Sequence, residues 1–208
     1  MKIGLMGGTF NPIHQGHLII SEYIRVRFPL DKIIFIPSGT PPHKEELKTV
    51  SAEHRYNMVS LAIETNPYFN ISSVEVNRKG KSYTVDTITE LKKLYPMEDL
   101  YFIVGADTIY EFTKWKDYEN LLRMTKFIVI GRYGLNVENN IEKIKELNQK
   151  YNAQILYMNG PLVDISSTDI RNRISEKESI KYIVPEKVEE YINENRLYVS
   201  EGSYGGLD

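Results

Sequence analysis

The sequence has no cysteine among its 208 residues. It can therefore form no disulfide, no thiolate nucleophile, no iron–sulfur cluster and no cysteine-ligated zinc site. An excess of positive charge is also missing, because 26 Lys+Arg stand against 28 Asp+Glu and leave a formal net charge of −2. This balance argues against a nucleic-acid partner, which normally requires a basic surface. Any anionic ligand must be bound at a local site.

Long apolar runs are missing as well. The longest uncharged N-terminal stretch, Ile3 to Ser21, contains several glycines, a proline and two histidines, so it cannot span a bilayer. Gly7 and Gly8 interrupt its apolar start too early for a signal peptide. We therefore expect a cytoplasmic protein without a membrane partner, and association into a homo-oligomer is left open.

The remaining composition is that of a globular protein, with 41% hydrophobic and 26% charged residues. A chain of this length can bury one sizeable core, and no linker-like segment divides it. We expect residues 1–199 to form a single domain and residues 200–208, which are rich in glycine and serine, to form a flexible tail.

Short β-branched or aromatic runs alternate with segments of helical spacing. Strands are expected at Lys2–Met6, Lys32–Ile36, Ile71–Val76, Leu100–Val104, Lys126–Ile130 and Gln154–Tyr157. Helices are expected around Tyr56–Ile63, Val85–Tyr95, Ile141–Tyr151 and Val188–Ile192, with Ser51 and Thr84 as N-caps and Pro185 as a first helical residue. This alternation predicts an α/β, Rossmann-like, doubly wound fold with a mostly parallel sheet and helices on both faces.

Chemically unusual residues follow five of the expected strands. These segments are Gly7–His17, Pro37–Lys44, Gly105–Asp107, Gly131–Arg132 and Ile165–Arg171. Ligands of open parallel sheets bind outside the carboxyl ends of the strands, so one crevice is expected to collect all five segments.

The first of these segments is the most informative. Gly7 and Gly8 would let the backbone approach a phosphate closely, and His14 and His17 would share one face at a helix N-terminus, which favours anions. Imidazoles there can donate hydrogen bonds to phosphate oxygens and change charge near neutral pH. By itself the histidine pair also fits a surface turn or part of a metal site; the glycines around it favour phosphate.

The segments Gly7–His17 and Ile165–Arg171 together resemble the two signatures of the nucleotidyltransferase superfamily, (H/T)xGH near the start and an SSTxxR-like pattern near the end. The resemblance implies a Rossmann-like fold and transfer of a nucleotidyl group from a nucleoside triphosphate. Class I aminoacyl-tRNA synthetases share the histidine signature more distantly. An RNA-binding fragment of that type is disfavoured, because no anticodon-binding domain fits in 208 residues.

The whole chain is similar to the bacterial nicotinate-nucleotide adenylyltransferase family. The matching residues are Pro41–Lys44, Ser82–Thr84, Gly105–Asp107, Trp115, Val184–Pro185 and Asn195–Tyr198. The chain departs from the family at Asn11, where many members have Asp, and in the extension Gly202–Asp208. We expect neither departure to alter the site.

This resemblance implies transfer of the adenylyl group of ATP to nicotinate mononucleotide, with Mg²⁺ carried on the ATP phosphates and no metal ligand from the protein. It assigns catalysis to His14, His17 and Arg171. It assigns ATP binding to Gly7, Gly8, Thr9, Phe10, His17, Asp107, Arg132, Ser167, Thr168 and Arg171, and acceptor binding to His43, Lys44, Thr84 and Trp115. Nicotinamide mononucleotide or phosphopantetheine as acceptor, and a noncatalytic nucleotide-binding module, stay open as alternatives.

Several of these residues also have purely structural interpretations. Arg171 would lie one turn inside a helix capped by Ser166 or Ser167, where it could hold a triphosphate or face solvent. Trp115, flanked by two lysines, is expected to be exposed for stacking, although a half-buried packing role is the alternative. Asp107 and Thr84 could serve only as caps, and Lys44 could belong to a solvated charged run. His54 and Arg55 are interpreted as helix-surface residues.

Overall fold

A six-stranded sheet forms the centre of the protein. The computed structural model describes residues 1–40, 49–132 and 136–199. The strand order is β3-β2-β1-β4-β5-β6, and every neighbouring pair is parallel. The order reverses between β1 and β4, as in doubly wound nucleotide-binding folds, whose ligands bind at that point. The predicted Rossmann-like fold is confirmed.

Five strands lie where the apolar runs predict them, and one does not. The strands are β1 Lys2–Gly8, β2 Lys32–Pro37, β3 Phe69–Ile71, β4 Asp99–Gly105, β5 Lys126–Arg132 and β6 Gln154–Gly160. The prediction of a strand at Ile71–Val76 was wrong, because the chain leaves the sheet edge after Ile71. The Ser72 amide still donates to the Phe35 carbonyl, but the next residues fold into turns, with the Asn77 amide on the Ser73 carbonyl.

Seven α-helices and two short 3-10 helices are described. They are α1 Gln15–Arg27, α2 Ala52–Ile63, α3 Thr84–Leu94, η2 Ala106–Tyr110, η3 Phe112–Lys114, α4 Tyr118–Met124, α5 Val137–Tyr151, α6 Ser167–Ser175 and α7 Glu186–Glu194. Ser51 caps α2 as expected, its Oγ accepting from the His54 amide at 3.2 Å. Thr84 is the first helical residue of α3 and Tyr83 its N-cap, whereas Pro185 is the N-cap of α7. Both expected starts are therefore shifted by one residue.

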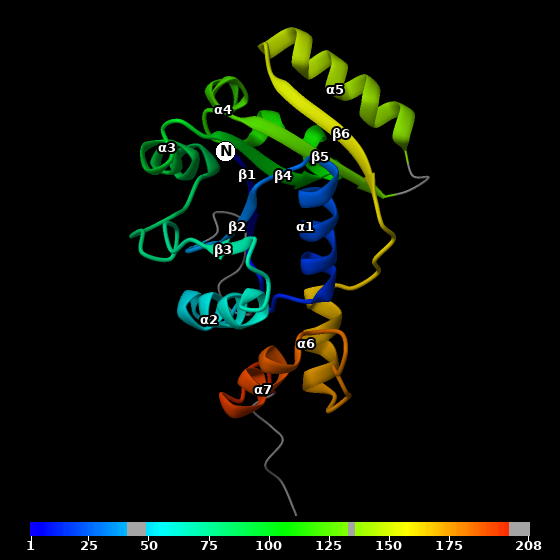
Figure 1. The fold of residues 1–208 in the computed structure, drawn as a ribbon. Coiled ribbons are helices and arrows are strands. Elements are labelled where there is room, and N and C mark those ends of the chain that lie inside the picture. Colours follow the sequence, from blue (N-terminus) through cyan, green and yellow to red (C-terminus); the bar gives the residue numbers. More distant parts are fainter. Residues whose placement is uncertain (41–48, 133–135, 200–208) are drawn as a thin grey trace, which may run out of the picture.

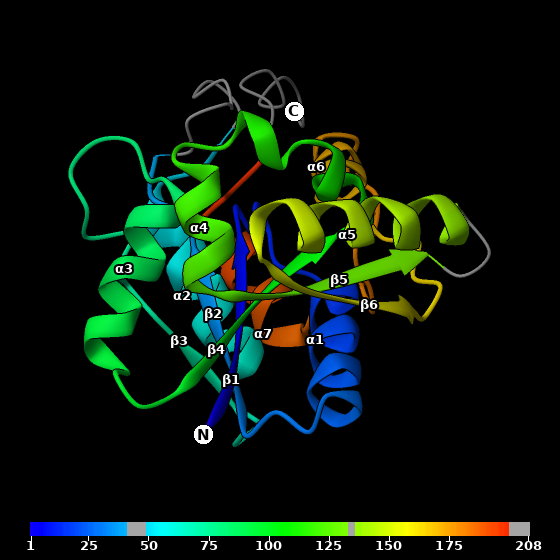
Figure 2. The ribbon, with the colours of Figure 1, turned by 90° about the horizontal axis from the view of Figure 1, so that it is seen from above.

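The helices cover both faces of the sheet (Figure 1). One face buries an apolar cluster that includes Val85, Ile88 and Leu91 of α3, Leu121 and Leu122 of α4, and Ile144 and Leu147 of α5. The other face buries a second cluster, with Ile24 of α1, Met58 and Val59 of α2, Ile170 of α6, and Val188 and Ile192 of α7. Figure 2 shows α3, α4 and α5 lying over the sheet, with α1, α2 and α7 behind it. None of the helices in the described ranges is long and apolar enough to cross a membrane.

Candidate active site

The loop after β1 is shaped by aromatic packing. A Cβ at Gly7 would lie 2.9 Å from Cζ of Phe102, and one at Gly8 would lie 3.0 Å from Cζ of Phe10. The two rings therefore leave little room for a side chain at either glycine, whatever ligand the backbone meets. Phe10 has a left-handed backbone with φ of 50°, and its ring is 2% exposed. Its side chain belongs to the core, so only the Phe10 backbone is left for the expected contact with ATP.

His14 and His17 stand together at the N-terminus of α1, as their spacing predicts. His14 is the N-cap, and the two ring centroids are 3.8 Å apart with 31° between the planes. The His14 backbone amide donates to Nδ1 of His17 at 3.3 Å. Because Nδ1 of His17 accepts, the neutral ring carries its hydrogen on Nε2 and can donate it to a ligand. A Cβ at Gly16 would lie 3.0 Å from Nδ1 of His14, so glycine lets that ring fold back over the first turn.

Both imidazoles are neutral at pH 7. Burial lowers the pKa of His14 to about 4. Burial, and then the nearby His14, lower the pKa of His17 to about 3. The expectation that these side chains change charge near neutral pH was therefore wrong for the ligand-free protein, because desolvation disfavours the charged form. A neutral imidazole still provides one N–H donor.

The second signature lies against the first. Ser166 caps α6, its Oγ accepting from the Asp169 amide at 3.1 Å. The Ser167 hydroxyl donates to the Pro12 carbonyl at 2.9 Å. Arg171 donates through Nη1 to the Asn11 carbonyl at 2.8 Å and through Nη2 to Oγ1 of Thr168 at 3.1 Å. Segments some 155 residues apart in sequence thus meet at the end of β1 and the start of α6.

Asn11 is a junction between this loop and the C-terminal part of the chain. Its Oδ1 accepts from the Val50 amide at 3.3 Å and from the Tyr198 hydroxyl at 2.9 Å. Burial raises the pKa of Tyr198, which keeps the hydroxyl protonated as a donor. A carboxylate at position 11 could accept both bonds, which agrees with the expectation that Asn in place of Asp is tolerated.

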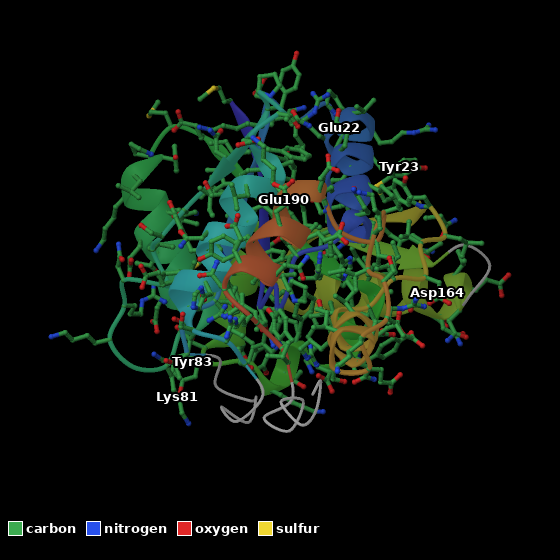
Figure 3. The ribbon with its side chains drawn as sticks, turned by 90° about the horizontal axis from the view of Figure 1, so that it is seen from below. Glu22, Tyr23, Lys81, Tyr83, Asp164 and Glu190 are labelled. Carbon is green, nitrogen blue, oxygen red and sulfur yellow. The ribbon has the colours of Figure 1, made fainter. Side chains whose placement is uncertain are left out.

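The expected acceptor-binding residues Thr84 and Trp115 lie in segments that contact each other. Lys116 pairs with Asp86 at 3.0 Å and lies 4.6 Å from the centroid of the Tyr83 ring, which joins the Trp115 segment to the start of α3. Figure 3 labels Tyr83 with Lys81 at this end of the sheet, away from Glu22 and Tyr23 on α1.

Trp115 is half-buried, so the expectation of an exposed ring was wrong. Its indole lies edge-on to Phe112 at 5.4 Å and to Phe102 at 6.4 Å between centroids, because the ring packs against the apolar cluster under α3 and α4. Nearby, Oγ of Ser82 is buried without a hydrogen-bond partner among the described residues.

The remaining candidate residues are only partly described. Asp107 is exposed in the first turn of η2, whose N-cap is Gly105, so it does not cap that helix. Arg132 ends β5, but its side chain lies outside the described part, as do His43 and Lys44. Over residues 1–40, 49–132 and 136–199, no three His, Asp or Glu side chains are grouped to hold a metal ion.

Arg55 is the residue that the sequence interpretation placed wrongly. It is 1% exposed, not on the helix surface. A signal existed, because Arg55 falls on the same face of α2 as the buried Met58, Val59 and Ala62. Its charge argued for the surface, but its helical position argued for the core.

A groove elsewhere on the surface is not this site. It has a volume of about 650 Å³ and lies between α1 and the end of α2, lined by Leu18, Ile19, Glu22, Tyr23, Val26, Arg27, Ala62, Thr65, Asn66, Phe69 and Pro161. None of the candidate residues that the structure describes lines it, and Glu22 and Tyr23 lie well away from Tyr83 in Figure 3.

Comparison with known proteins shows which proteins this chain resembles. Residues 5–173 match the family model described as cytidylyltransferase-like. The chain is 44% identical to a probable nicotinate-nucleotide adenylyltransferase of Thermoanaerobacter sp. (strain X514), over 99% of this chain and 98% of that protein. It is 47% identical to the protein of that description from Moorella thermoacetica, over 95% and 91%.

Solved structures show the same fold. The nicotinic acid mononucleotide adenylyltransferase of Plasmodium falciparum, complexed with NaAD, has a TM-score of 0.76 and 22% sequence identity, over 95% of this chain and 97% of that chain. The same enzyme complexed with APC has a TM-score of 0.75. Taken with the paired signatures after β1 and at the start of α6, the identities of 44% and 47% over nearly the full length place this chain in the cytidylyltransferase-like family and, within it, among the nicotinate-nucleotide adenylyltransferases.

Proposed function

We propose that this protein transfers the adenylyl group of ATP to nicotinate mononucleotide, releasing pyrophosphate and forming nicotinate adenine dinucleotide for NAD biosynthesis. The observation that carries the proposal is the contact of Ser167 and Arg171 with the backbone of Asn11 and Pro12, directly before the His14–His17 pair. This arrangement collects hydrogen-bond donors and one permanent positive charge where a polyanion would meet two helix N-termini.

The triphosphate would lie between the starts of α1 and α6. His17 would donate from Nε2, and Arg171 would donate from the guanidinium nitrogens that its two protein bonds leave available. The hydroxyls of Ser167 and Thr168 and the backbone around Gly7, Gly8, Thr9 and Phe10 would complete the phosphate site. Asp107 and Arg132, at the ends of β4 and β5, would lie toward the adenosine.

Catalysis in this site would depend on positioning and electrostatics. The phosphate of the acceptor is already ionised at pH 7 and can attack the α-phosphorus without a general base, so the protein needs no covalent nucleophile. As the α-phosphorus becomes five-coordinate, His14, His17 and Arg171 would stabilise the growing negative charge.

Magnesium fits this site as a partner of ATP. The described residues offer no grouped His, Asp or Glu ligands, and Mg²⁺ is commonly held by substrate phosphates and water molecules. Bound in this way, the ion supplies neutralisation of phosphate charge.

The acceptor would be recognised at the start of α3. The helix N-terminus at Thr84 would favour the nicotinate carboxylate, and the Ser82 hydroxyl, which has no partner among the described residues, would be a donor nearby. Trp115 would contact the pyridine ring with the part of its indole that is not packed against Phe112. His43 and Lys44 would bind the acceptor phosphate. A cytoplasmic location belongs to this proposal, because ATP is supplied there.

The test is pyrophosphate release from ATP and Mg²⁺ with nicotinate mononucleotide, and in parallel with nicotinamide mononucleotide. We expect a strong preference for nicotinate mononucleotide. In the same assay, His17→Ala should lose about 3 kcal/mol of transition-state stabilisation, more than a hundredfold in kcat, while remaining folded.

Comparable rates with both acceptors would refute the roles of Thr84 and Trp115. Release with neither acceptor, while ATP still binds, would favour another acceptor such as phosphopantetheine or a noncatalytic module. Full turnover by His17→Ala would refute the role of that side chain. His54→Ala, which removes a histidine that contacts Tyr191 on α7, is the matched control and should keep its kcat.

A further inference from the structure

Arg55 is a fully buried cation that belongs to none of the motifs discussed above. It lies in the first turn of α2, and its guanidinium makes four hydrogen bonds. Nε donates to the Val50 carbonyl at 3.2 Å, Nη1 to the Thr9 carbonyl at 2.8 Å and to the Ser38 hydroxyl at 3.4 Å, and Nη2 to the Gly39 carbonyl at 2.9 Å. Within the described residues, all these acceptors are neutral oxygens.

These acceptors belong to two different loops. Thr9 lies in the loop after β1, which approaches the ATP phosphates in the proposed function. Ser38 and Gly39 lie in the loop after β2, which leads toward His43 and Lys44. The guanidinium of Arg55 thus bonds to both loops. A second link between them is the Ser38 amide, which donates to the Gly8 carbonyl at 2.8 Å.

The loop after β2 is in turn connected to α3. The Gly39 amide donates to the carboxylate of Glu75, and Oγ1 of Thr87 in α3 donates to the same carboxylate at 2.7 Å. The Ser82 amide, just before α3, donates to the Thr40 carbonyl at 3.1 Å. A continuous series of hydrogen bonds therefore runs from Thr9, through Arg55 and Gly39, to the helix whose start would bind the acceptor.

Burying the charged guanidinium of Arg55 costs folding free energy, because the group loses its hydration. Burial lowers the pKa of Arg55, since the guanidinium has been removed from water and none of its bonds to the described residues is to a carboxylate. A lysine has the same charge, but its single ammonium on a flexible stem cannot reproduce a fork that reaches several carbonyls at fixed positions. The shape of arginine, as well as its charge, is needed here.

We propose that Arg55 is a positioning residue. It fixes the loop after β1, at Thr9, relative to the loop after β2, at Ser38 and Gly39, so that binding and alignment of both substrates depend on it. The inference rests on the proposed function, because it takes the substrates from there. It assigns Arg55 no contact with either substrate. Misplacement of reacting groups by about 1 Å can cost a hundredfold in rate.

The experiment compares Arg55→Lys with Met58→Ala. Met58 is fully buried on the same face of α2 but packs in the apolar core and bonds to neither loop. Melting temperature, kcat/KM for each substrate, and the Kd for ATP by calorimetry are measured where all proteins are folded. We expect Arg55→Lys to lose ten- to a hundredfold in kcat/KM for both substrates and to bind ATP more weakly, whereas Met58→Ala loses stability but stays within twofold in both kinetic constants.

A second variant tests the coupling without changing Arg55. In Gly39→Ala, the added Cβ would clash with the carbonyl oxygen of Glu75 and shift the Gly39 carbonyl away from the guanidinium. We expect weaker ATP binding although the substitution lies in the other loop, and this holds as a test even if Arg55→Lys does not fold.

The outcomes separate this inference from the proposed function. Unchanged Kd and kcat/KM in folded Arg55→Lys, or unchanged ATP binding in Gly39→Ala, would show that Arg55 is only structural. A wild-type protein that binds ATP but releases no pyrophosphate would refute the proposed reaction, while a weaker Kd in Arg55→Lys would still support the positioning role. A wild-type protein that binds no ATP would refute both.

Discussion

The protonation of His14 and His17 depends on how deeply the two rings are buried. Burial lowers the pKa of His14 to about 4, and burial together with the neighbouring His14 lowers that of His17 to about 3. In the proposed function, a bound triphosphate would favour the imidazolium form and raise both pKa values. The spacing of three residues predicts the pairing of the rings, whereas their neutrality follows from burial by neighbours such as Phe10, which the spacing does not reveal.

At the scale of one residue, acid should destabilise the protein through His14. The unfolded chain binds a proton at His14 below about pH 6.5, but the folded protein does not until about pH 4. This contribution to stability is therefore complete above pH 6.5 and is lost as the pH falls toward 4, by up to about 3 kcal/mol. Urea unfolding of wild type and His14→Gln at several pH values between 7 and 4.5 measures it.

The variant isolates His14 from the carboxylates, which also respond to acid in this range. His14→Gln should show a shallower loss of unfolding free energy with falling pH than the wild type. Parallel curves for the two proteins would contradict the burial-lowered pKa.

At the scale of elements, the existence of most helices and strands could be predicted and their ends could not. Apolar periodicity located α3 and α5, but the first turn of α3 is decided by Tyr83, whose backbone is extended, not by a hydroxyl cap at Thr84. The third strand was predicted too late in the chain, at Ile71–Val76 and not at Phe69–Ile71. Val74 and Val76 continue an apolar run, but the chain leaves the sheet before it reaches them. Periodicity reports which face is buried, and tertiary contacts decide where an element begins or stops.

The cap of α6 provides a prediction at this scale. Ser166→Ala removes the acceptor for the Asp169 amide and should cost about 1 kcal/mol of stability. Because Ser167 and Thr168 lie in the turn that would loosen, the KM for ATP should rise severalfold. Urea unfolding and steady-state kinetics check both effects.

Ser175→Ala at the other end of α6 is the matched control, since its hydroxyl donates only to the carbonyl of Asn172 within the described hydrogen bonds. It should leave the KM for ATP unchanged. An unchanged KM in Ser166→Ala as well would show that the first turn holds without its cap.

At the scale of the whole molecule, the site depends on segments that only the fold brings together. The two signatures could be recognised from the sequence, because each keeps its residues close along the chain. The topology of the sheet also predicted that one crevice would collect both. The individual hydrogen bonds that join them, and the roles of Arg55 and Tyr198, could not be predicted, because they arise where α2, α6 and the segment after α7 converge on the loop after β1. Such contacts have no local spacing to detect.

Tyr198 allows that convergence to be tested over the full length of the chain. Its hydroxyl donates to Asn11 across 187 positions of sequence, and the carbonyl of the same Asn11 accepts from Arg171. Tyr198→Phe should cost about 1 kcal/mol of stability and raise the KM for ATP severalfold, because the loop that positions Arg171 loses one of its supports. Urea unfolding and the KM for ATP measure the two effects.

Tyr191→Phe is the control that separates stability from positioning. The Tyr191 hydroxyl accepts from Asn57 at 3.0 Å and lies 3.0 Å from Nδ1 of His54, so it ties α7 to α2 without contacting the loop after β1. Its loss should lower the unfolding free energy by a similar amount while the KM for ATP stays at the wild-type value. If both variants raise the KM equally, the effect comes from general loosening of α7; if only Tyr198→Phe does, the C-terminal segment directly supports the phosphate site.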